Sequence, residues 1–375
     1  MAEPTVAVEK SDAVLDVRDL TVKFRTRRGA FTAVDGLTFQ VQPGEVMGVV
    51  GESGSGKSVS MMSILGLIRD PNCSVTGQAF FSGQDLITLP EKDLRSLRGR
   101  RVAMIFQDPM TALTPVFTVG WHIVEQLQAH GRMPSRVAKQ RAVELLDEVG
   151  IPDAARRVDD YPHQFSGGMR QRAVIAMALA HNPNLLIADE PTTALDVTTQ
   201  AQILELLRRL QREHNSSIVL ITHDMGVVSE IADRVLVMYA GRAAEVGPRR
   251  EVFRNANHPY TWGLLGSVPR VGRTRLRRLP TIPGHPISPD AIPEGCAFAD
   301  RCRHRFDRCD ERPELAGTAG HLDACWLPRD DRQAVRRASV VAAAEEGDPG
   351  DALPAAVGGG FDIEPGHIEP DGTQL

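Results

Sequence analysis

The chain has 375 residues, of which 24% are charged and 42% hydrophobic, and a formal net charge of -5. This length suits one large domain plus a smaller one, and the composition is that of a globular protein rather than a disordered or fibrous one. The negative net charge gives no electrostatic reason to expect a nucleic-acid partner, because such proteins usually carry a basic face that displaces counterions from phosphates. No apolar run reaches the roughly 18 residues of a membrane span, and the first residues lack the basic block and the apolar block of a signal peptide. A cytoplasmic protein is expected.

The order of predicted elements along the chain indicates an α/β fold. Residues 1–12 are expected to form a flexible arm, and alternating apolar residues from Leu15 to Phe24 predict strands at a sheet edge. A strand at 45–50 then runs into a glycine loop and a helix at 57–67. A mainly helical block follows at about 108–180. Next come strands at 185–188 and 218–221 with a helix at 202–214 between them. We therefore expect a core sheet covered by helices, with an inserted helical subdomain.

Residues 51–58, GESGSGKS, fit the phosphate-loop pattern. In this pattern glycines turn backbone N–H groups toward phosphates, the lysine reaches the β- and γ-phosphates, and the last hydroxyl binds Mg²⁺. A chance glycine-rich turn is the alternative, but the preceding strand and the following helix are the context that the motif requires. The predicted ATP-binding residues here are Gly51, Glu52, Ser53, Gly54, Ser55, Gly56, Lys57, Ser58 and Val59, with Ser58 also on Mg²⁺.

Two carboxylates, Asp189 and Glu190, end the apolar strand that begins at Leu185. The end of such a strand lies at the edge of the sheet where phosphate ligands bind. Asp189 is then suited to organise Mg²⁺ through water, and Glu190 to orient and polarise the water that attacks the γ-phosphate. A lone pair of this kind is usually a solvated turn, but beside a phosphate loop a catalytic role is the better interpretation.

Residues 165–172, FSGGMRQR, resemble the signature of ABC ATPases. Small residues ahead of a helix offer backbone donors to a γ-phosphate, although a simple helix cap by Ser166 is compatible with the same letters. The resemblance implies that this helix faces the nucleotide of another subunit. The residues predicted to contact that nucleotide are Ser166, Gly167, Gly168, Met169 and, further along, Asp196.

The remaining elements of that family follow in order, with Gln107 in IFQDP, TALD at 193–196 and His223 in ITHD. The resemblance implies that Gln107 senses Mg²⁺ and the attacking water, that His223 contacts the γ-phosphate and that Asp196 acts across a dimer. Gln107 and His223 thus join Glu190 as catalytic candidates. It also implies that Phe24 stacks on adenine. Simple core packing is the alternative for Phe24 and for His223 taken alone.

Further segments resemble the ATPases of oligopeptide and dipeptide importers: FQDPMTALTP at 106–115, HPYT at 258–261 and IPG at 282–284. The resemblance spans about residues 13–330. It implies a P-loop ABC ATPase domain at 13–255, a small cysteine-containing C-terminal module at 256–330 and a mostly disordered tail at 331–375.

That resemblance implies an ATPase that powers peptide uptake from the cytoplasmic face of the membrane. Its partners would be a second ABC ATPase subunit, usually a different chain, two transmembrane permease subunits and an extracytoplasmic substrate-binding protein. Import of nickel or another small solute, and a non-transport ABC ATPase, are the alternatives. An iron–sulfur binding module with a secondary ATPase is a more remote one.

Four cysteines lie close together near the end of the chain, and no two have the CxxC spacing of zinc ribbons. In a reducing compartment such a set favours a metal site over disulfides, and four thiolates suit either Zn²⁺ or an iron–sulfur cluster. GCAFADRC at 295–302 resembles the C-terminal module of peptide-importer ATPases, which favours a [4Fe–4S] cluster over zinc. Reduced structural cysteines are the third interpretation. The four are Cys296, Cys302, Cys309 and Cys325.

Overall fold

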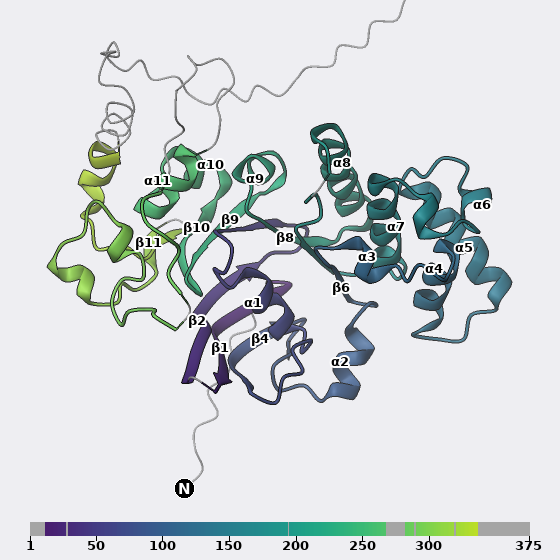
Figure 1. Cartoon of the computed structure of the whole chain (residues 1–375), viewed down its shortest axis with the longest axis horizontal. Helices are drawn as coiled ribbons and strands as arrows, with labels where there is room; N and C mark the ends of the chain where they lie inside the picture. Colours follow the sequence, from purple (N-terminus) through teal and green to yellow (C-terminus); the bar gives the residue numbers. More distant parts are fainter. Residues whose placement is uncertain are drawn as a thin grey trace, which may run out of the picture.

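Two sheets and the helices around them make up the computed structural model (Figure 1). Among the described helices, none combines the length and apolarity needed to cross a membrane. Of the expected N-terminal arm, only residue 12 belongs to the described part. The structure describes residues 12–27, 29–193, 195–267, 282–288, 290–318 and 320–336.

The smaller sheet is antiparallel, with strand order β2-β1-β4-β5. Alternate residues of its central strand, such as Leu15, Val17, Leu20 and Val22, are fully buried, so the predicted strands are confirmed. The strands are β1 (Leu15–Thr26), β2 (Gly29–Val41), β4 (Cys73–Phe81) and β5 (Gln84–Asp85).

The larger sheet has strand order β11-β12-β10-β9-β3-β8-β7-β6. Its strands from β9 to β6 run parallel, and β10, β12 and β11 continue it in antiparallel pairing. Every residue of β3 and β7 is buried, which is typical of parallel strands covered on both faces. The strands are β3 (Val46–Val50), β6 (Val102–Ile105), β7 (Leu185–Asp189), β8 (Ser217–Thr222), β9 (Arg234–Tyr239), β10 (Arg242–Pro248), β11 (Ala316–Thr318) and β12 (His321–Asp323).

The expected helical block forms a lobe at the right of Figure 1. Its helices share one buried apolar cluster with the helix after β7 and with strands of the larger sheet. The block consists of α3 (Pro109–Ala112), α4 (Val119–Gln128), α5 (Ser135–Glu148), α6 (Ala154–Arg157), η1 (Pro162–Gln164) and α7 (Gly167–Leu179). The other helices are α1 (Lys57–Ile64), α2 (Glu91–Leu97), α8 (Val197–His214), α9 (Met225–Ile231), α10 (Arg249–Arg254), α11 (Pro259–Gly266), η2 (Ala299–Arg301) and η3 (Asp307–Asp310).

Two predicted helix boundaries were wrong. Helix α1 ends at Ile64, short of the expected residue 67, and Gly66 beyond it takes a left-handed φ of 60°. Helix α8 begins at Val197 rather than near residue 202, because the Asp196 side chain accepts the N–H of Thr199 and so caps its first turn.

The segment that follows α11 is joined to the larger sheet. Val246 of β10 lies opposite Leu322 of β12, and Glu245 lies opposite Asp323. Residues 329–336 are helical, so ordered structure continues past residue 330, where the tail was expected to begin. Residues 337–375 of that expected tail lie outside the described residues. The segment that contains β11 and β12 therefore extends the larger sheet rather than forming a separate layer.

Candidate active site

The phosphate loop lies between the buried strand β3 and helix α1, as its sequence predicts. Two of its glycines are sterically required. A Cβ on Gly51 would come within 2.2 Å of the Met238 carbonyl oxygen, and one on Gly56, whose φ is 93°, within 2.6 Å of the Ala33 carbonyl oxygen. Larger residues would push the loop away from its neighbouring strands. The close packing therefore fixes the path of the backbone that would carry phosphate.

The two polar side chains that end this loop point into the site. Lys57 is buried, and its Nζ donates to the carbonyl oxygens of Gly51 (2.7 Å) and Glu52 (2.9 Å). The Ser58 hydroxyl donates to Asp189 Oδ1 at the end of β7, 2.9 Å away. Hydroxyl and carboxylate oxygens are ligands that Mg²⁺ prefers, so the pair fits the predicted magnesium position.

Glu190 lies at the centre of a second group of polar side chains. Its Oε2 accepts from Gln107 Nε2 and from the Thr193 hydroxyl, both at 2.9 Å, and its Oε1 lies 3.1 Å from His223 Nδ1. Glu190 has a φ of 47°, a backbone conformation that non-glycine residues rarely adopt. The fold thus brings Gln107, after β6, and His223, after β8, to the carboxylate of Glu190, after β7.

The charges of the two groups are coupled. Burial raises the pKa of Asp189, although the hydrogen bond from Ser58 opposes this. Burial would also raise the pKa of Glu190, but its hydrogen bonds with His223 and Thr193 outweigh that effect, and the net pKa lies below the usual value. Burial lowers the pKa of Lys57 against the opposing charges of these carboxylates. These hydrogen bonds therefore favour the ionised form of Glu190, which is the form that polarises water.

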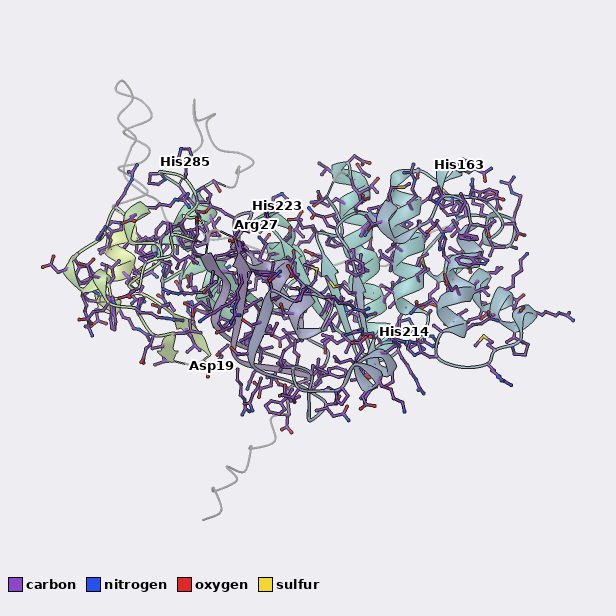
Figure 2. All side chains as sticks on the ribbon, turned by 60° about the horizontal axis from the view of Figure 1, so that its bottom comes forward. Asp19, Arg27, His163, His214, His223 and His285 are labelled. Atoms are coloured by element: carbon purple, nitrogen blue, oxygen red, sulfur yellow. The ribbon has the colours of Figure 1, made fainter. Side chains whose placement is uncertain are left out.

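The predicted signature residues are not part of this group. Ser166 caps α7 by accepting the N–H of Met169, and Asp196 caps α8. Gly167 and Gly168 form the first turn of α7, on the helical lobe. In Figure 2, His163, three residues before Ser166, lies toward the right of the molecule, well away from His223 near its centre. On one chain, the predicted signature is therefore separated from the group around Glu190.

Two further predicted ATP contacts occupy ordinary packing positions. Phe24 lies in β1, partly buried, with its ring stacked on Phe31 at a centroid distance of 5.3 Å. Val59 lies in the first turn of α1, packed against the core beneath the smaller sheet. Ser53 and Gly54 form the turn of the loop, and Ser55 is buried. Stacking on adenine by Phe24 remains a prediction.

The four clustered cysteines line a single cavity, together with apolar side chains such as Phe298 and Trp326. All four are free thiols. Burial raises the pKa of Cys296, raises that of Cys302 to about 11, and raises that of Cys325 to about 12. Sequence spacing alone did not require that these four thiols meet at one cavity.

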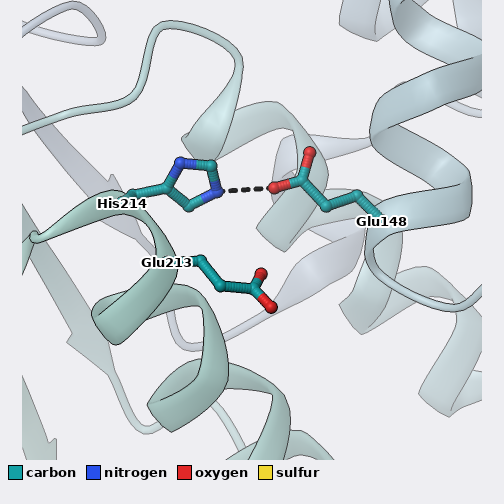
Figure 3. Close-up of side chains that lie close together, drawn as sticks. All are labelled: Glu148, Glu213 and His214. Carbon is teal, nitrogen blue, oxygen red and sulfur yellow. Dashed lines mark hydrogen bonds and ion pairs between the residues drawn. The ribbon is translucent and has the colours of Figure 1, made fainter.

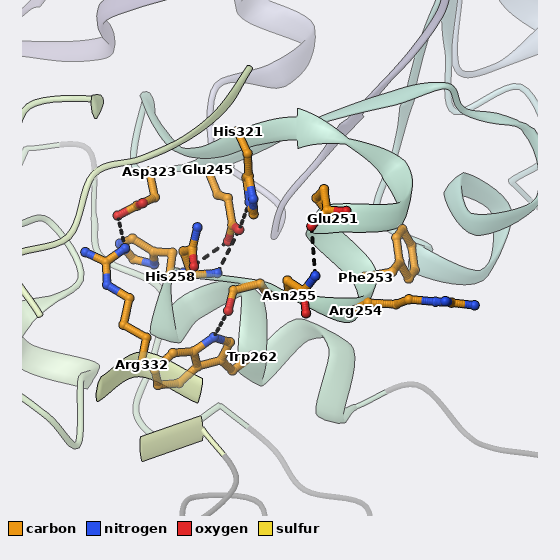
Figure 4. A network of polar contacts seen from close by, with 12 residues as sticks. Glu245, Glu251, Phe253, Arg254, Asn255, His258, Trp262, His321, Asp323 and Arg332 are labelled. Carbon is orange, nitrogen blue, oxygen red and sulfur yellow. Dashed lines mark hydrogen bonds and ion pairs between the residues drawn. The ribbon is translucent and has the colours of Figure 1, made fainter. Parts of the chain in front are cut away.

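A buried polar network holds the wall of that cavity in place (Figure 4). Glu245, fully buried in β10, accepts the backbone N–H of His258 and bonds the His321 ring. Arg332 pairs with Asp323 at 2.6 Å and donates to the carbonyl oxygen of Cys325. The HPYT segment therefore begins helix α11 within this network, where the ring of His258 accepts the N–H of Tyr260. Burial lowers the pKa of His258 to about 4.

A cluster that the sequence did not suggest joins the helical lobe to α8. Glu148, at the end of α5, bonds His214 Nε2 at the end of α8, and the Glu213 carboxylate lies beside them (Figure 3). Arg141 lies 3.7 Å from the Glu148 carboxylate. The group is an interhelical contact between the lobe and the core.

Sequence reasoning missed three residues of the nucleotide site. Thr193, three residues after Glu190, shares its carboxylate, and spacing could have suggested this. Tyr260 and Arg301 both bind Glu52 in the phosphate loop from the C-terminal part of the chain. No local pattern could have revealed contacts between segments 208 and 249 residues apart.

Two regions of the chain match known protein families. Residues 34–193 match the family described as ABC transporter, and residues 244–309 match the family described as oligopeptide/dipeptide transporter, C-terminal region. The second match contains Cys296, Cys302 and Cys309 and stops before Cys325.

Full-length relatives and solved structures extend these matches. The chain is 49% identical to the oligopeptide transport ATP-binding protein OppD of Salmonella typhimurium, across 86% of this chain and 96% of the relative. It is 50% identical to the dipeptide transport ATP-binding protein DppD of Bacillus subtilis, across 84% and 95%. A dimeric structure of the ATP-binding cassette MJ0796 bound to ADP and Pi matches with a TM-score of 0.57 and 27% identity, covering 63% of this chain and 99% of that one.

Proposed function

This chain belongs to the ABC transporter family, in the group of oligopeptide and dipeptide transport ATP-binding proteins, and we propose that it hydrolyses ATP to drive peptide import. The observation that carries the proposal is the convergence of Gln107, Thr193 and His223 on the Glu190 carboxylate beside the phosphate loop. This arrangement suits phosphoryl transfer to water, which depends on positioning and charge stabilisation.

Binding of ATP falls to the phosphate loop and the start of α1. The backbone N–H groups of the loop and Lys57 hold the triphosphate, and Ser58 with Asp189 would hold Mg²⁺. When bound, the cation neutralises charge on the β- and γ-phosphates. This assignment is supported by the oxygen ligands at that position and by the burial of Lys57.

Hydrolysis falls to the group around Glu190. The carboxylate accepts a hydrogen bond from the attacking water and polarises it, and Gln107 and His223 fix the carboxylate and approach the γ-phosphate. The lowered pKa of Glu190 supports this role, because the ionised carboxylate is the form that can take a proton from water.

The signature is proposed to act on a different chain's nucleotide. Ser166 and the first turn of α7 form a helix N-terminus, away from Glu190 of the same chain. Pairing with a second ABC ATPase subunit, usually a different chain, would place them over the partner's phosphate loop, with Asp196 at the same interface. The dimeric cassette with bound ADP and Pi supports such a pairing. Closure on ATP and reopening after hydrolysis then move the transporter.

The chain is proposed to work at the cytoplasmic face of the membrane. There it would dock on two transmembrane permease subunits, which receive peptides from an extracytoplasmic substrate-binding protein. The peptide-transport relatives support this assembly.

A reconstituted complex tests the proposal. The chain is copurified with its membrane subunits, the ligand carried by the binding protein is identified, and ATP turnover is measured in liposomes with and without it. We expect the peptide-loaded binding protein to raise turnover severalfold, since cargo shifts the complex toward the closed dimer.

Other outcomes of this experiment would contradict particular parts of the proposal. Stimulation by nickel or another small solute, and not by peptides, would show the peptide cargo to be wrong. Recovery of the chain without membrane subunits would favour an ABC ATPase outside transport.

We further propose that the C-terminal region, residues 256–330, is a small cysteine module built around a [4Fe–4S] cluster. Four thiols that line one apolar cavity fit such a group, because iron–sulfur clusters are held by four thiolates in poorly solvated surroundings. Cys296, Cys302, Cys309 and Cys325 would hold it. The cluster would staple a segment with little apolar core of its own.

A Cys302→Ser variant is expected to lose the metal, because it removes one of four ligands. Iron, zinc and acid-labile sulfide are measured after anaerobic purification, and about four irons per chain are expected for the unmodified protein. Cys73→Ser, which alters the cysteine outside the cavity, is the matched control and should keep the iron. Stoichiometric zinc without iron would refute the cluster, and a metal-free protein would refute both metals.

A further inference from the structure

Glu52, the second residue of the phosphate loop, is held by residues from beyond the ATPase core. Its backbone N–H donates to the Tyr260 hydroxyl oxygen at 2.8 Å. Its carboxylate accepts two hydrogen bonds from the Arg301 guanidinium, at 2.6 and 3.0 Å. A two-pronged pair of this kind fixes both position and orientation.

The Arg301 guanidinium is itself locked in place. The residue is only 8% exposed, its Nε donates to the carbonyl oxygen of Pro283, and one terminal nitrogen lies 3.3 Å from the Tyr239 hydroxyl. Its charge also lies over the rings of Tyr239 and Phe298, at 5.7 and 6.0 Å. Such a cation is not a mobile surface charge, because its packing determines where its charge acts.

The charge of Glu52 makes this contact matter for ATP. Glu52 is the only acidic residue among residues 51–58, and its carbonyl oxygen accepts from Lys57 Nζ. An uncompensated carboxylate in a loop that receives a triphosphate would repel it, and the effect is strong where water is scarce. Arg301 cancels that charge and at the same time ties down the first turn of the loop.

We propose that Arg301 is a positioning residue for ATP binding, which acts by neutralising and anchoring Glu52. The inference rests on the proposed binding of ATP at this loop. It also gives the C-terminal region a task in the ATPase: Arg301 ends the short helix η2, and the next residue, Cys302, lines the cysteine cavity. One turn of chain therefore links the cavity to the phosphate loop.

The test compares the affinities of full-length variants for AMP-PNP with Mg²⁺, measured by calorimetric titration. Arg301→Met is expected to weaken binding about tenfold, which is about 1.4 kcal/mol. Adding Glu52→Gln removes the carboxylate that Arg301→Met leaves without its partner. The affinity of the double variant is therefore expected to return to within about threefold of that of the unmodified protein. The loss in Arg301→Met should shrink at high salt, because screening weakens the repulsion.

Arg305→Met is the matched control. Arg305 lies four residues on, pairs with Asp300 and Asp310 at the surface, and should leave the affinity unchanged. A merely structural role for Arg301 predicts no rescue by Glu52→Gln.

Four outcomes would overturn the proposal or its premise. An Arg301→Met variant with unmodified affinity, or a folded double variant that binds as weakly as Arg301→Met, would refute it. If Arg301→Met does not fold, Arg301→Gln, which is also neutral, is used in both backgrounds, and failure of Glu52→Gln to improve its binding would refute the proposal. Absence of binding by the unmodified protein would instead refute ATP binding at the loop.

Discussion

A Glu190→Gln variant is expected to bind ATP with nearly unmodified affinity and to hydrolyse it at least about a hundredfold more slowly. The amide has the shape of the carboxylate and keeps hydrogen-bonding partners among Gln107, Thr193 and His223. It carries no negative charge, so it cannot polarise the attacking water. Steady-state phosphate release and nucleotide titration on the same preparation measure the two effects.

The matched control for this variant is Glu205→Gln, which alters an exposed glutamate on α8 and should leave both properties unchanged. Steady-state hydrolysis at the unmodified rate by Glu190→Gln would show that another group activates the water. A parallel loss of ATP affinity would show that the substitution disturbed the loop rather than the chemistry.

A Lys57→Ala variant is expected to fail at the earlier step, with ATP affinity reduced by about a hundredfold or more. Lys57 is the only basic residue within residues 51–58, and its Nζ lies among the backbone oxygens of the loop. Without it, the triphosphate meets Asp189 and Glu190 with no facing cation from the loop. Direct titration with a fluorescent ATP analogue measures the loss.

Lys139→Ala serves as the control, because that lysine lies exposed on α5 and pairs only with Asp159 in the contacts described. Binding by Lys57→Ala at the unmodified affinity would contradict the assignment of the loop. Together, the Glu190 and Lys57 variants separate hydrolysis from binding, which a single substitution cannot do.

The sequence predicted those parts of the fold that local patterns encode. The strand before Gly51, the strand that ends at Asp189 and the helical block all appear where periodicity and flanking residues placed them. The predicted ends of helices were less accurate, because capping residues determine where a helix begins and ends. Asp196 was interpreted only as a contact across a dimer, although its position also starts α8 five residues earlier than expected.

Contacts between distant segments could not be predicted in this way. The grouping of Gln107, Glu190 and His223 followed from a family resemblance, since no local pattern brings three strand ends together. The bond between Glu52 and Arg301 had no counterpart in any motif. Such contacts depend on which strands are neighbours in the sheet, and that order is set by the packing of the whole chain.

The pairing of β12 with β10 also covers an edge of the sheet that could otherwise pair with another molecule. A chain cut after α10 would leave the outer backbone groups of β10 unpaired and ready to recruit a strand from another molecule. The sheet ends instead on β11, three exposed residues that include Gly317, a poor template for such recruitment. We therefore expect a chain cut after α10 to aggregate more readily than the full chain.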